Sequence, residues 1–256
     1  MLKISASQML TMRAASIAGF THEMVRHIRR FCPRLVHSLS SSELLGIVGV
    51  TIQQARARGF TRRGPLRLWV EFSFMFGSGF TEDPMLPWIG AVLTDNDEDD
   101  QMERAWRLHD LWPVYREAVL GPSHEFYVAA LRRVDSISEL DTRKHIPGNA
   151  FIAEILGKIY PERLHHAGLQ AHQQLVRKAL TMSHGIGSDS PSDVFLIAIL
   201  MSFFGHDCFR DPRHAWLGEA LIRFDDTDPT SIFDSLRRTS IAYLKTVLRT
   251  SGTRQT

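Results

Sequence analysis

The sequence lacks the features by which several common protein classes are recognised. Its two cysteines, Cys32 and Cys208, belong to no Cys-x-x-Cys or similar spacing, so a zinc site is not indicated and a reduced pair is expected. The longest apolar run, residues 194–204, has 11 residues, whereas a membrane-spanning helix needs about 20. The N-terminus has no basic region followed by an apolar stretch, which predicts a cytoplasmic protein without an export signal.

An excess of charge of either sign is also missing. The chain has 30 Lys and Arg residues against 28 Asp and Glu residues, a formal net charge of +2. Arginines gather in residues 26–30 and 56–63, but acidic segments separate these clusters, whereas a nucleic-acid-binding surface normally carries its cations on one stripe. The sequence therefore predicts no nucleic-acid partner and, without an apolar span, no membrane partner.

Patterns typical of catalysis are absent as well. The chain contains no G-x-S-x-G nucleophile elbow, no G-x-x-x-x-G-K-[ST] phosphate-binding loop and no G-x-G-x-x-G after a strand. We therefore expect no catalytic residue, no metal site and no cofactor, and a protein that is not an enzyme.

What the sequence does contain is an internal repeat. Residues 76–93 (FGSGFTEDPMLPWIGAVL) align without a gap with residues 204–221 (FGHDCFRDPRHAWLGEAL), at an offset of half the length of the chain. Seven of the 18 positions are identical: Phe76/Phe204, Gly77/Gly205, Asp83/Asp211, Pro84/Pro212, Trp88/Trp216, Gly90/Gly218 and Leu93/Leu221. The offset continues outside this window, aligning Pro33/Pro161, His37/His165, Val48/Val176 and Tyr115/Tyr243. We interpret the chain as two copies of one unit, residues 1–128 and 129–256, which are expected to pack as one body.

The spacing of apolar residues predicts an all-α protein. Apolar positions recur at helical intervals in nearly every segment, and strand-like alternation bounded by Asn-Gly or Asp-Gly turns does not occur. In the first half, helices are expected at about 7–18, 20–31, 43–58, 65–77, 84–93 and 101–119. In the second half, they are expected at about 149–159, 161–183, 191–205, 212–223 and 229–249.

The repeated Phe-Gly and Asp-Pro pairs have a mechanical interpretation. Glycine ends a helix because it can take the left-handed conformation that a helix C-cap requires, and an Asp-Pro pair starts the next helix because the carboxylate caps free N–H groups while proline fits the first turn. Trp88 and Trp216, four residues after each proline, are expected to face inward. The motif is therefore predicted to be architectural.

One arrangement suggests an enzyme instead. His206-Asp207 resembles the His-Asp pair of helical metal-dependent phosphohydrolases, with His184 and Asp225 or Asp226 as further candidate ligands. In the first copy, however, the matching residues are Ser78-Gly79, which is typical of a tolerant surface turn. The separate group of His165, His166 and His172 is expected on a single helix, with His165 and His172 sharing a face.

The acidic stretch at residues 95–100 is the candidate partner-binding site. Its six residues carry five carboxylates: Asp95, Asp97, Glu98, Asp99 and Asp100. Such a run is most often a solvated loop before a capped helix, but it also favours binding a basic partner by mimicking phosphates. The spacing lacks the Gly and the late Glu of an EF-hand, so calcium is not indicated.

The first copy of the repeat also resembles a known family. Phe74, Met75, Phe76, Gly77, Phe80, Asp83, Pro84, Pro87 and Trp88 fit a segment found in bacterial helical proteins that accompany type VI secretion effectors. The second copy departs from this pattern, with Phe209 one place late and Ala215 in place of the second proline. The resemblance implies an immunity protein that binds and inhibits a cognate toxin effector. The effector it implies is a nuclease with a restriction-endonuclease-like toxin domain.

Two other functions remain open from the sequence. One is the metal-dependent phosphohydrolase built on His206 and Asp207. The other is an adaptor or chaperone that loads the effector into the secretion system without inhibiting it.

Overall fold

A computed structural model describes residues 5–94, 100–139, 148–222 and 229–252 of the chain. Every regular element within these residues is helical and none is a strand, which confirms the all-α prediction. No helix among them combines the length and the apolar character needed to cross a membrane.

Contacts within the chain divide it into two compact units, which are described separately. Unit 1 comprises Met1–Ser78 and Asn96–Trp106, and unit 2 comprises Gly79–Asp95 and Arg107–Thr256. This division follows contacts rather than sequence similarity. The division into repeated halves, 1–128 and 129–256, therefore stays a prediction.

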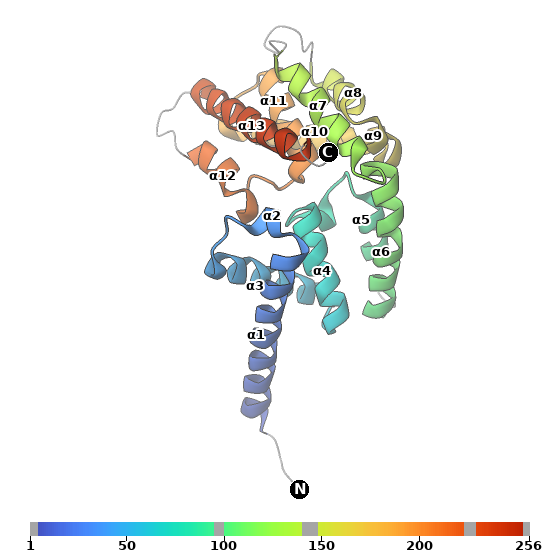
Figure 1. Cartoon of the computed structure of the whole chain (residues 1–256), viewed down its shortest axis with the longest axis vertical. Helices are drawn as coiled ribbons and strands as arrows, with labels where there is room; N and C mark the ends of the chain where they lie inside the picture. The colour runs from blue at the N-terminus through green and yellow to red at the C-terminus, as the bar shows by residue number, and fades with distance from the viewer. Residues whose placement is uncertain (1–4, 95–99, 140–147, 223–228, 253–256) are drawn as a thin grey trace. The chain divides into compact units, whose positions relative to one another are not determined.

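Unit 1 is built around a group of three helices (Figure 1). Its elements are α1 (Ala6–Phe31), α2 (Pro33–Val36), α3 (Ser41–Ala57), α4 (Arg63–Phe76) and the first part of α6 (Gln101–Tyr115). Helix α3 packs against both α1 and α4, and Ile28, Leu44 and Val48 are completely buried between them. The first turns of α1, residues 6–16, are exposed along their whole length.

Unit 2 holds the remaining helices. They are η1 (Phe80–Glu82), α5 (Pro87–Thr94), the rest of α6, the π-helical turn η2 (Arg116–Leu120), α7 (Glu125–Glu139), α8 (Asn149–Ile159), α9 (Pro161–Ala167), α10 (Leu169–Ile186), α11 (Pro191–Phe204), η4 (Pro212–His214), α12 (Ala215–Ile222) and α13 (Pro229–Gly252). Helix α10 packs against α8 and α11, and α7 lies along α13 (Figure 1). The longest apolar run, residues 194–204, lies in α11, in which Val194, Ile197 and Ala198 are completely buried.

The helix boundaries recur along the chain at the offset of the predicted repeat. Applied to the first residues of α2, α3, α4, α5 and α6, this offset gives the first residues of α9, α10, α11, α12 and α13, respectively. Applied to the last residues of α1, α4 and α5, it gives those of α8, α11 and α12. Contacts recur too, because α3 packs against α1 and α4 just as α10 packs against α8 and α11.

Local sequence explains where these helices begin and end. Ser40 caps α3, because its side chain accepts a hydrogen bond from the N–H of Glu43, whose carboxylate accepts one from the N–H of Ser40. Helices α4 and α11 end at Gly77 and Gly205, whose φ angles are +116° and +95°. Their ψ angles are 155° and 151°, so these glycines leave the helix in an extended conformation rather than the left-handed helical one.

Several elements differ from the prediction. Helix α1 continues through Gly19, because a glycine inside a helix costs only about 1 kcal/mol. Conversely, Gly168 has a φ of +83° and divides the expected 161–183 helix into α9 and α10. Helix α7 was not predicted, and the expected 101–119 helix changes from α-helical to π-helical geometry after Tyr115.

Candidate functional site

Most of the predicted acidic site lies outside the described residues. Asp95, Asp97, Glu98 and Asp99 are not described, and Asp100 is exposed at the start of α6. Its carboxylate lies 3.3 Å from Nη1 of Arg62, in an ion pair exposed at both ends. An exposed pair of this kind contributes about 1 kcal/mol or less, so Asp100 is available to a partner at little cost.

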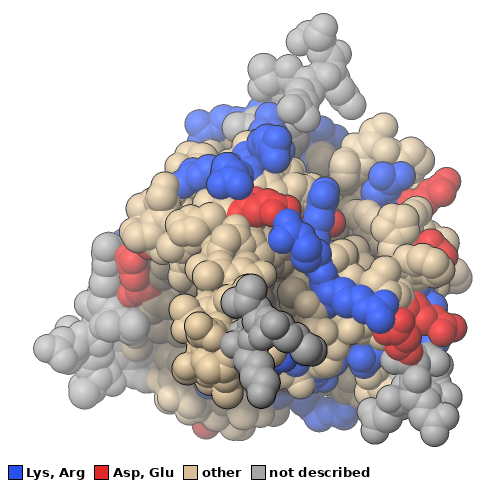
Figure 2. Space-filling model, turned by 90° about the horizontal axis from the view of Figure 1, so that it is seen from below, with Lys and Arg blue, Asp and Glu red and all other residues tan. Residues whose placement is uncertain are grey.

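Charge on the described surface is mixed, as the composition predicted. The face drawn in Figure 2 carries Lys and Arg side chains beside and between the Asp and Glu side chains. In unit 1, Arg63 pairs with Glu23, and Arg67 pairs with Glu71 at 2.9 Å. Glu71 also accepts a hydrogen bond of 2.6 Å from Nε2 of His27.

The two Asp-Pro pairs form the same buried turn. An oxygen of the Asp83 carboxylate accepts a hydrogen bond of 2.8 Å from the N–H of Met85. One of Asp211 accepts a bond of 2.9 Å from the N–H of Arg213, and both aspartates are buried. The predicted capping is confirmed for Asp211, which caps the 3-10 turn η4. The prediction that Asp83-Pro84 starts a helix is wrong, because Asp83 holds only a short turn and α5 begins at Pro87.

The aromatic residues of the motif also occupy matching places. The Trp88 ring centroid lies 5.6 Å from that of Tyr115, and the Trp216 ring lies 5.2 Å from that of Tyr243. The repeat aligns Trp88 with Trp216 and Tyr115 with Tyr243, so the two pairs are equivalent in sequence as well. Each tryptophan thus packs against a tyrosine of a following helix, which agrees with the prediction that both face inward.

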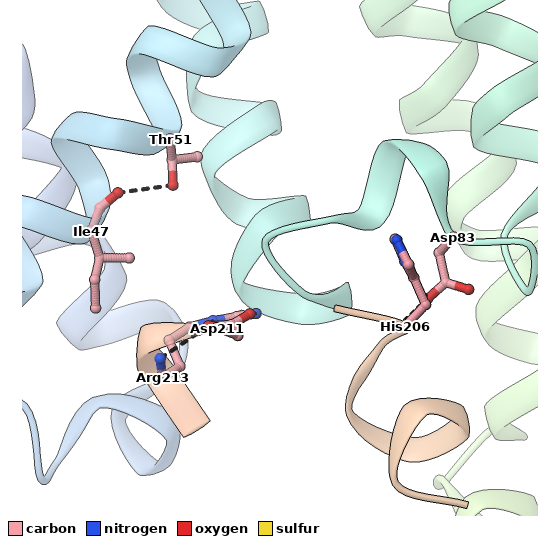
Figure 3. Close-up of polar contacts among 6 residues, drawn as sticks. All are labelled: Ile47, Thr51, Asp83, His206, Asp211 and Arg213. Atoms are coloured by element: carbon pink, nitrogen blue, oxygen red, sulfur yellow. Dashed lines mark hydrogen bonds and ion pairs between the residues drawn. The ribbon is translucent and has the colours of Figure 1, made fainter. Parts of the chain in front are cut away.

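Asp83 makes a long-range contact that the sequence did not predict. Its second oxygen accepts a hydrogen bond of 3.1 Å from the backbone N–H of His206, at the loop after α11 (Figure 3). Gly79 lies against the same loop, where a Cβ atom on it would come 2.8 Å from Cε1 of His206 and 2.9 Å from Cβ of Asp207. Gly79 and Asp207, which the repeat aligns, are therefore neighbours at this loop crossing.

The buried Arg163 helps to keep the Asp83 carboxylate ionised by lowering its pKa. Burial by itself raises the pKa of Asp83, but the contact with His206 and the charge of Arg163 more than offset it, so the pKa falls below its ordinary value. Arg163 is buried, and its Nη1 donates a hydrogen bond to the carbonyl of Ser202. Its Nε has no hydrogen-bond partner in the part of the chain that is described.

Tyrosines surround this arginine. The hydroxyl of Tyr160 donates a hydrogen bond of 2.7 Å to the carbonyl of Val119. Burial raises the pKa of Tyr127 to about 12 and also raises the pKa values of Tyr115 and Tyr160. These hydroxyls therefore stay protonated near neutral pH, and the group forms part of the core.

The residues nominated for a metal site are not gathered into one where the structure describes them. Nδ1 of His206 faces the Asp83 carboxylate at 3.8 Å, and His184 forms an exposed pair with Asp189 at 3.0 Å. Among the described residues, no group of three His, Cys, Asp or Glu side chains is placed to hold a metal. Asp225 and Asp226 lie outside the described residues.

The expectation that His165, His166 and His172 share one helix is wrong. Gly168 ends α9 after His165 and His166, and His172 belongs to α10. His172 is buried, and its Nδ1 lies 3.2 Å from the carbonyl oxygen of Gly168. Burial lowers the pKa of both His166 and His172, which keeps them neutral at physiological pH.

The thiols offer no nucleophile either. Neither Cys32 nor Cys208 forms a disulfide bond within the described part of the chain. Burial raises the pKa of the Cys208 thiol well above 9.0, and a buried thiol of this kind is inert.

The outer face of α6 carries a feature that the sequence reasoning missed. Trp106 is 67% exposed and Val114 is 61% exposed, although both are large apolar residues. Ala105 and Leu108 define the buried face of the helix, and Trp106 is one position out of register with that face. This position outside the apolar face was the sequence feature that could have indicated an exposed Trp106.

Comparison with known proteins gives no relative. No protein-family model matches the chain, and no curated sequence or solved structure matches it.

Proposed function

We propose that this protein is an immunity protein, which binds a toxin effector made by the same bacterium and inhibits it by covering its working surface. Binding is stoichiometric and without turnover, and it takes place in the cytoplasm. The effector belongs to a type VI secretion system and is a nuclease. The single observation that supports this proposal best is the exposure of large apolar side chains on otherwise well-packed helices, above all Trp106.

The distribution of polar groups supports a binding role over a catalytic one. Asp83 uses both carboxylate oxygens on backbone N–H groups, and Asp211 binds the N–H and the guanidinium of Arg213 (Figure 3). Functional carboxylates of hydrolases instead keep an oxygen or a proton for substrate. These two buried carboxylates thus hold the chain's own turns together.

An inhibitor of this kind needs a substantial interface. Specific complexes bury about 1,600 Å² in total, and a few aromatic or arginine anchors contribute most of the affinity. A tryptophan exposed on a rigid helix meets that requirement, because little side-chain entropy is lost when it is covered.

The acidic stretch contributes to association. Replacing Asp95, Asp97, Glu98, Asp99 and Asp100 with Ser should slow binding of a basic effector more at low salt than at high salt. Equal association rates for the variant and the wild type at low salt would remove this stretch from the interface.

We also propose that the chain arose by duplication of a half-length unit and that the two copies pack as one body. The recurrence of helix boundaries supports this, as do the paired turns of Asp83 and Asp211 and the paired contacts of Trp88 and Trp216.

Affinity capture tests the proposal. The tagged full-length chain is recovered from the bacterium that produces it, and co-purifying proteins are identified and quantified by mass spectrometry. We expect one effector at an equimolar ratio, whose nuclease activity is blocked in the complex. An effector that stays active in the complex would indicate a loading adaptor instead. If no protein co-purifies and the chain binds divalent metal that His206→Ala abolishes, the phosphohydrolase alternative replaces this proposal.

A further inference from the structure

The apolar stripe of α1 continues from its packed half into its exposed first turns. Six residues follow one another at spacings of four and three, which is the pattern of a coiled-coil seam: Leu10, Ala14, Ile17, Thr21, Met24 and Ile28. The last three are buried within unit 1, whereas Leu10 is 66% exposed and Ala14 is exposed as well. Figure 1 shows the first turns extending past α3 and α4, the helices that pack against α1. The first half of the seam is therefore largely exposed.

These first turns have little local support as an isolated helix. Helices of fewer than about 12–15 residues are marginal in water, and most helices in proteins are stabilised by the packing of one face. Arg13 is the only charged residue between Ser5 and Thr21, so ion pairs between side chains one turn apart do not stabilise this stretch. Gly19, a poor helix former, separates the stretch from the packed half of α1. A second helix along the seam would therefore both cover Leu10 and stabilise the turns that carry it.

The composition of the stretch limits what can cover it. A charged protein surface gains little there, because Arg13 is its only charge and Glu23, the nearest carboxylate along α1, pairs with Arg63. Helices that lie on membranes carry many Lys and Arg residues on their polar face, which this stretch does not. An uncharged helix with the same alternation of large and small apolar residues fits the seam, and α1 of a second copy is such a helix.

We infer that the first turns of α1 pair with those of a second copy, in an antiparallel arrangement about a two-fold axis near Met12. This register sets Leu10 of each copy against Ala14 of the other, so that a large residue meets a small one. It overlaps residues 6–18 of the two helices and ends before Phe20, where α1 is already buried within unit 1. The overlap is about 20 Å long, which puts the interface at the low end of specific contacts, about 1,200 Å² or less. A weak, reversible dimer with a Kd on the order of 10–100 µM is therefore expected.

Sedimentation velocity of the full-length chain, over concentrations that bracket this Kd, measures dimerisation. Leu10→Ala should weaken it about 30-fold, because each dimer loses the contacts of two leucines while alanine keeps the helix. The matched control is Met12→Ala: Met12 is 61% exposed but points about 200° around the helix from Leu10, so this variant should dimerise like the wild type. Raising the salt concentration should not dissociate the dimer, because the only charged side chains beside the seam are the two copies of Arg13. Amide hydrogen exchange of residues 8–18 should slow as the concentration rises.

A chain that stays monomeric throughout this range would overturn the inference. A dimer that is insensitive to Leu10→Ala, that Met12→Ala weakens equally, or that dissociates at high salt would place the contact elsewhere and overturn it as well. If hydrogen exchange of residues 8–18 slows only when an effector is bound, the effector covers the seam instead of a second copy. The inference goes beyond the proposed function and does not depend on it, since a monomeric chain that inhibits an effector would refute the dimer and leave the immunity role in place.

Discussion

Replacing Asp83 with alanine should destabilise unit 2 more than any single change on the surface. Asp83 is only 4% exposed and its carboxylate binds two backbone N–H groups, those of Met85 and His206. Asp83→Ala leaves both donors without an acceptor in a region that excludes water. The variant also removes the negative charge that faces the buried guanidinium of Arg163.

The magnitude follows from these contacts. A buried donor left unsatisfied costs about 1–3 kcal/mol, and removing one partner of a buried charge pair costs about 3–5 kcal/mol. Part of this loss is offset because the folded state no longer buries a carboxylate. We therefore expect the free energy of unfolding to fall by about 3–5 kcal/mol, and by less for Asp83→Asn, which keeps one acceptor oxygen.

Urea unfolding monitored by circular dichroism and tryptophan fluorescence measures this effect. Asp83, Met85, Arg163 and His206 all belong to unit 2, so the transition of that unit should move to lower urea while any separate transition of unit 1 stays in place. The control Asp189→Ala removes an exposed aspartate and should change the stability by less than about 0.5 kcal/mol. A loss below about 1 kcal/mol for Asp83→Ala would refute the structural role assigned to this carboxylate.

Three further changes follow from particular contacts. Gly79→Ala should lower the free energy of unfolding by about 1–3 kcal/mol, because the added Cβ would overlap the loop after α11. Gly90→Ala, whose added Cβ would meet nothing within 4 Å, should instead stabilise α5 by about 0.5–1 kcal/mol. Thermal unfolding compares the two variants, and stability changes of the same sign would contradict the packing described for Gly79. Burial, helped by Arg213, lowers the pKa of His214 to about 4 from its ordinary 6.5, so below pH 6.5 the unfolded chain takes up a proton that the folded chain does not. Stability should therefore fall by about 3 kcal/mol as the pH drops from 6.5 toward 4, and a His214→Gln variant with the same pH dependence as the wild type would disprove this. Tyr160→Phe should cost about 1 kcal/mol in urea unfolding, since it removes the hydroxyl that binds the carbonyl of Val119; an unchanged stability would show that this bond contributes nothing.

Features set by neighbouring residues were predictable from the sequence. The cap of α3 by Ser40 and the turns held by Asp83 and Asp211 follow from side chains that act on backbone groups close by in the chain, and so does the end of α4 and α11 at a glycine. Residues that act locally leave a pattern that can be recognised without knowing the fold.

Features that depend on distant residues could not be predicted. Asp83 and His206 are 123 positions apart, and no local pattern indicates that they meet. The exposure of Trp106 was only partly predictable, because its position out of register with Ala105 and Leu108 is visible in the sequence but the covered face of α6 depends on the rest of the chain. Gly19 and Gly168 show the same limit, since one glycine continues a helix and the other divides one.

A titration of nuclease activity tests the central claim most directly. The effector recovered with the chain is separated from it, refolded and assayed on nucleic acid while the purified chain is added in increasing amounts. Tight stoichiometric inhibition predicts a linear fall that reaches zero at one equivalent of chain. Full nuclease activity in the presence of an excess of folded chain would contradict the account.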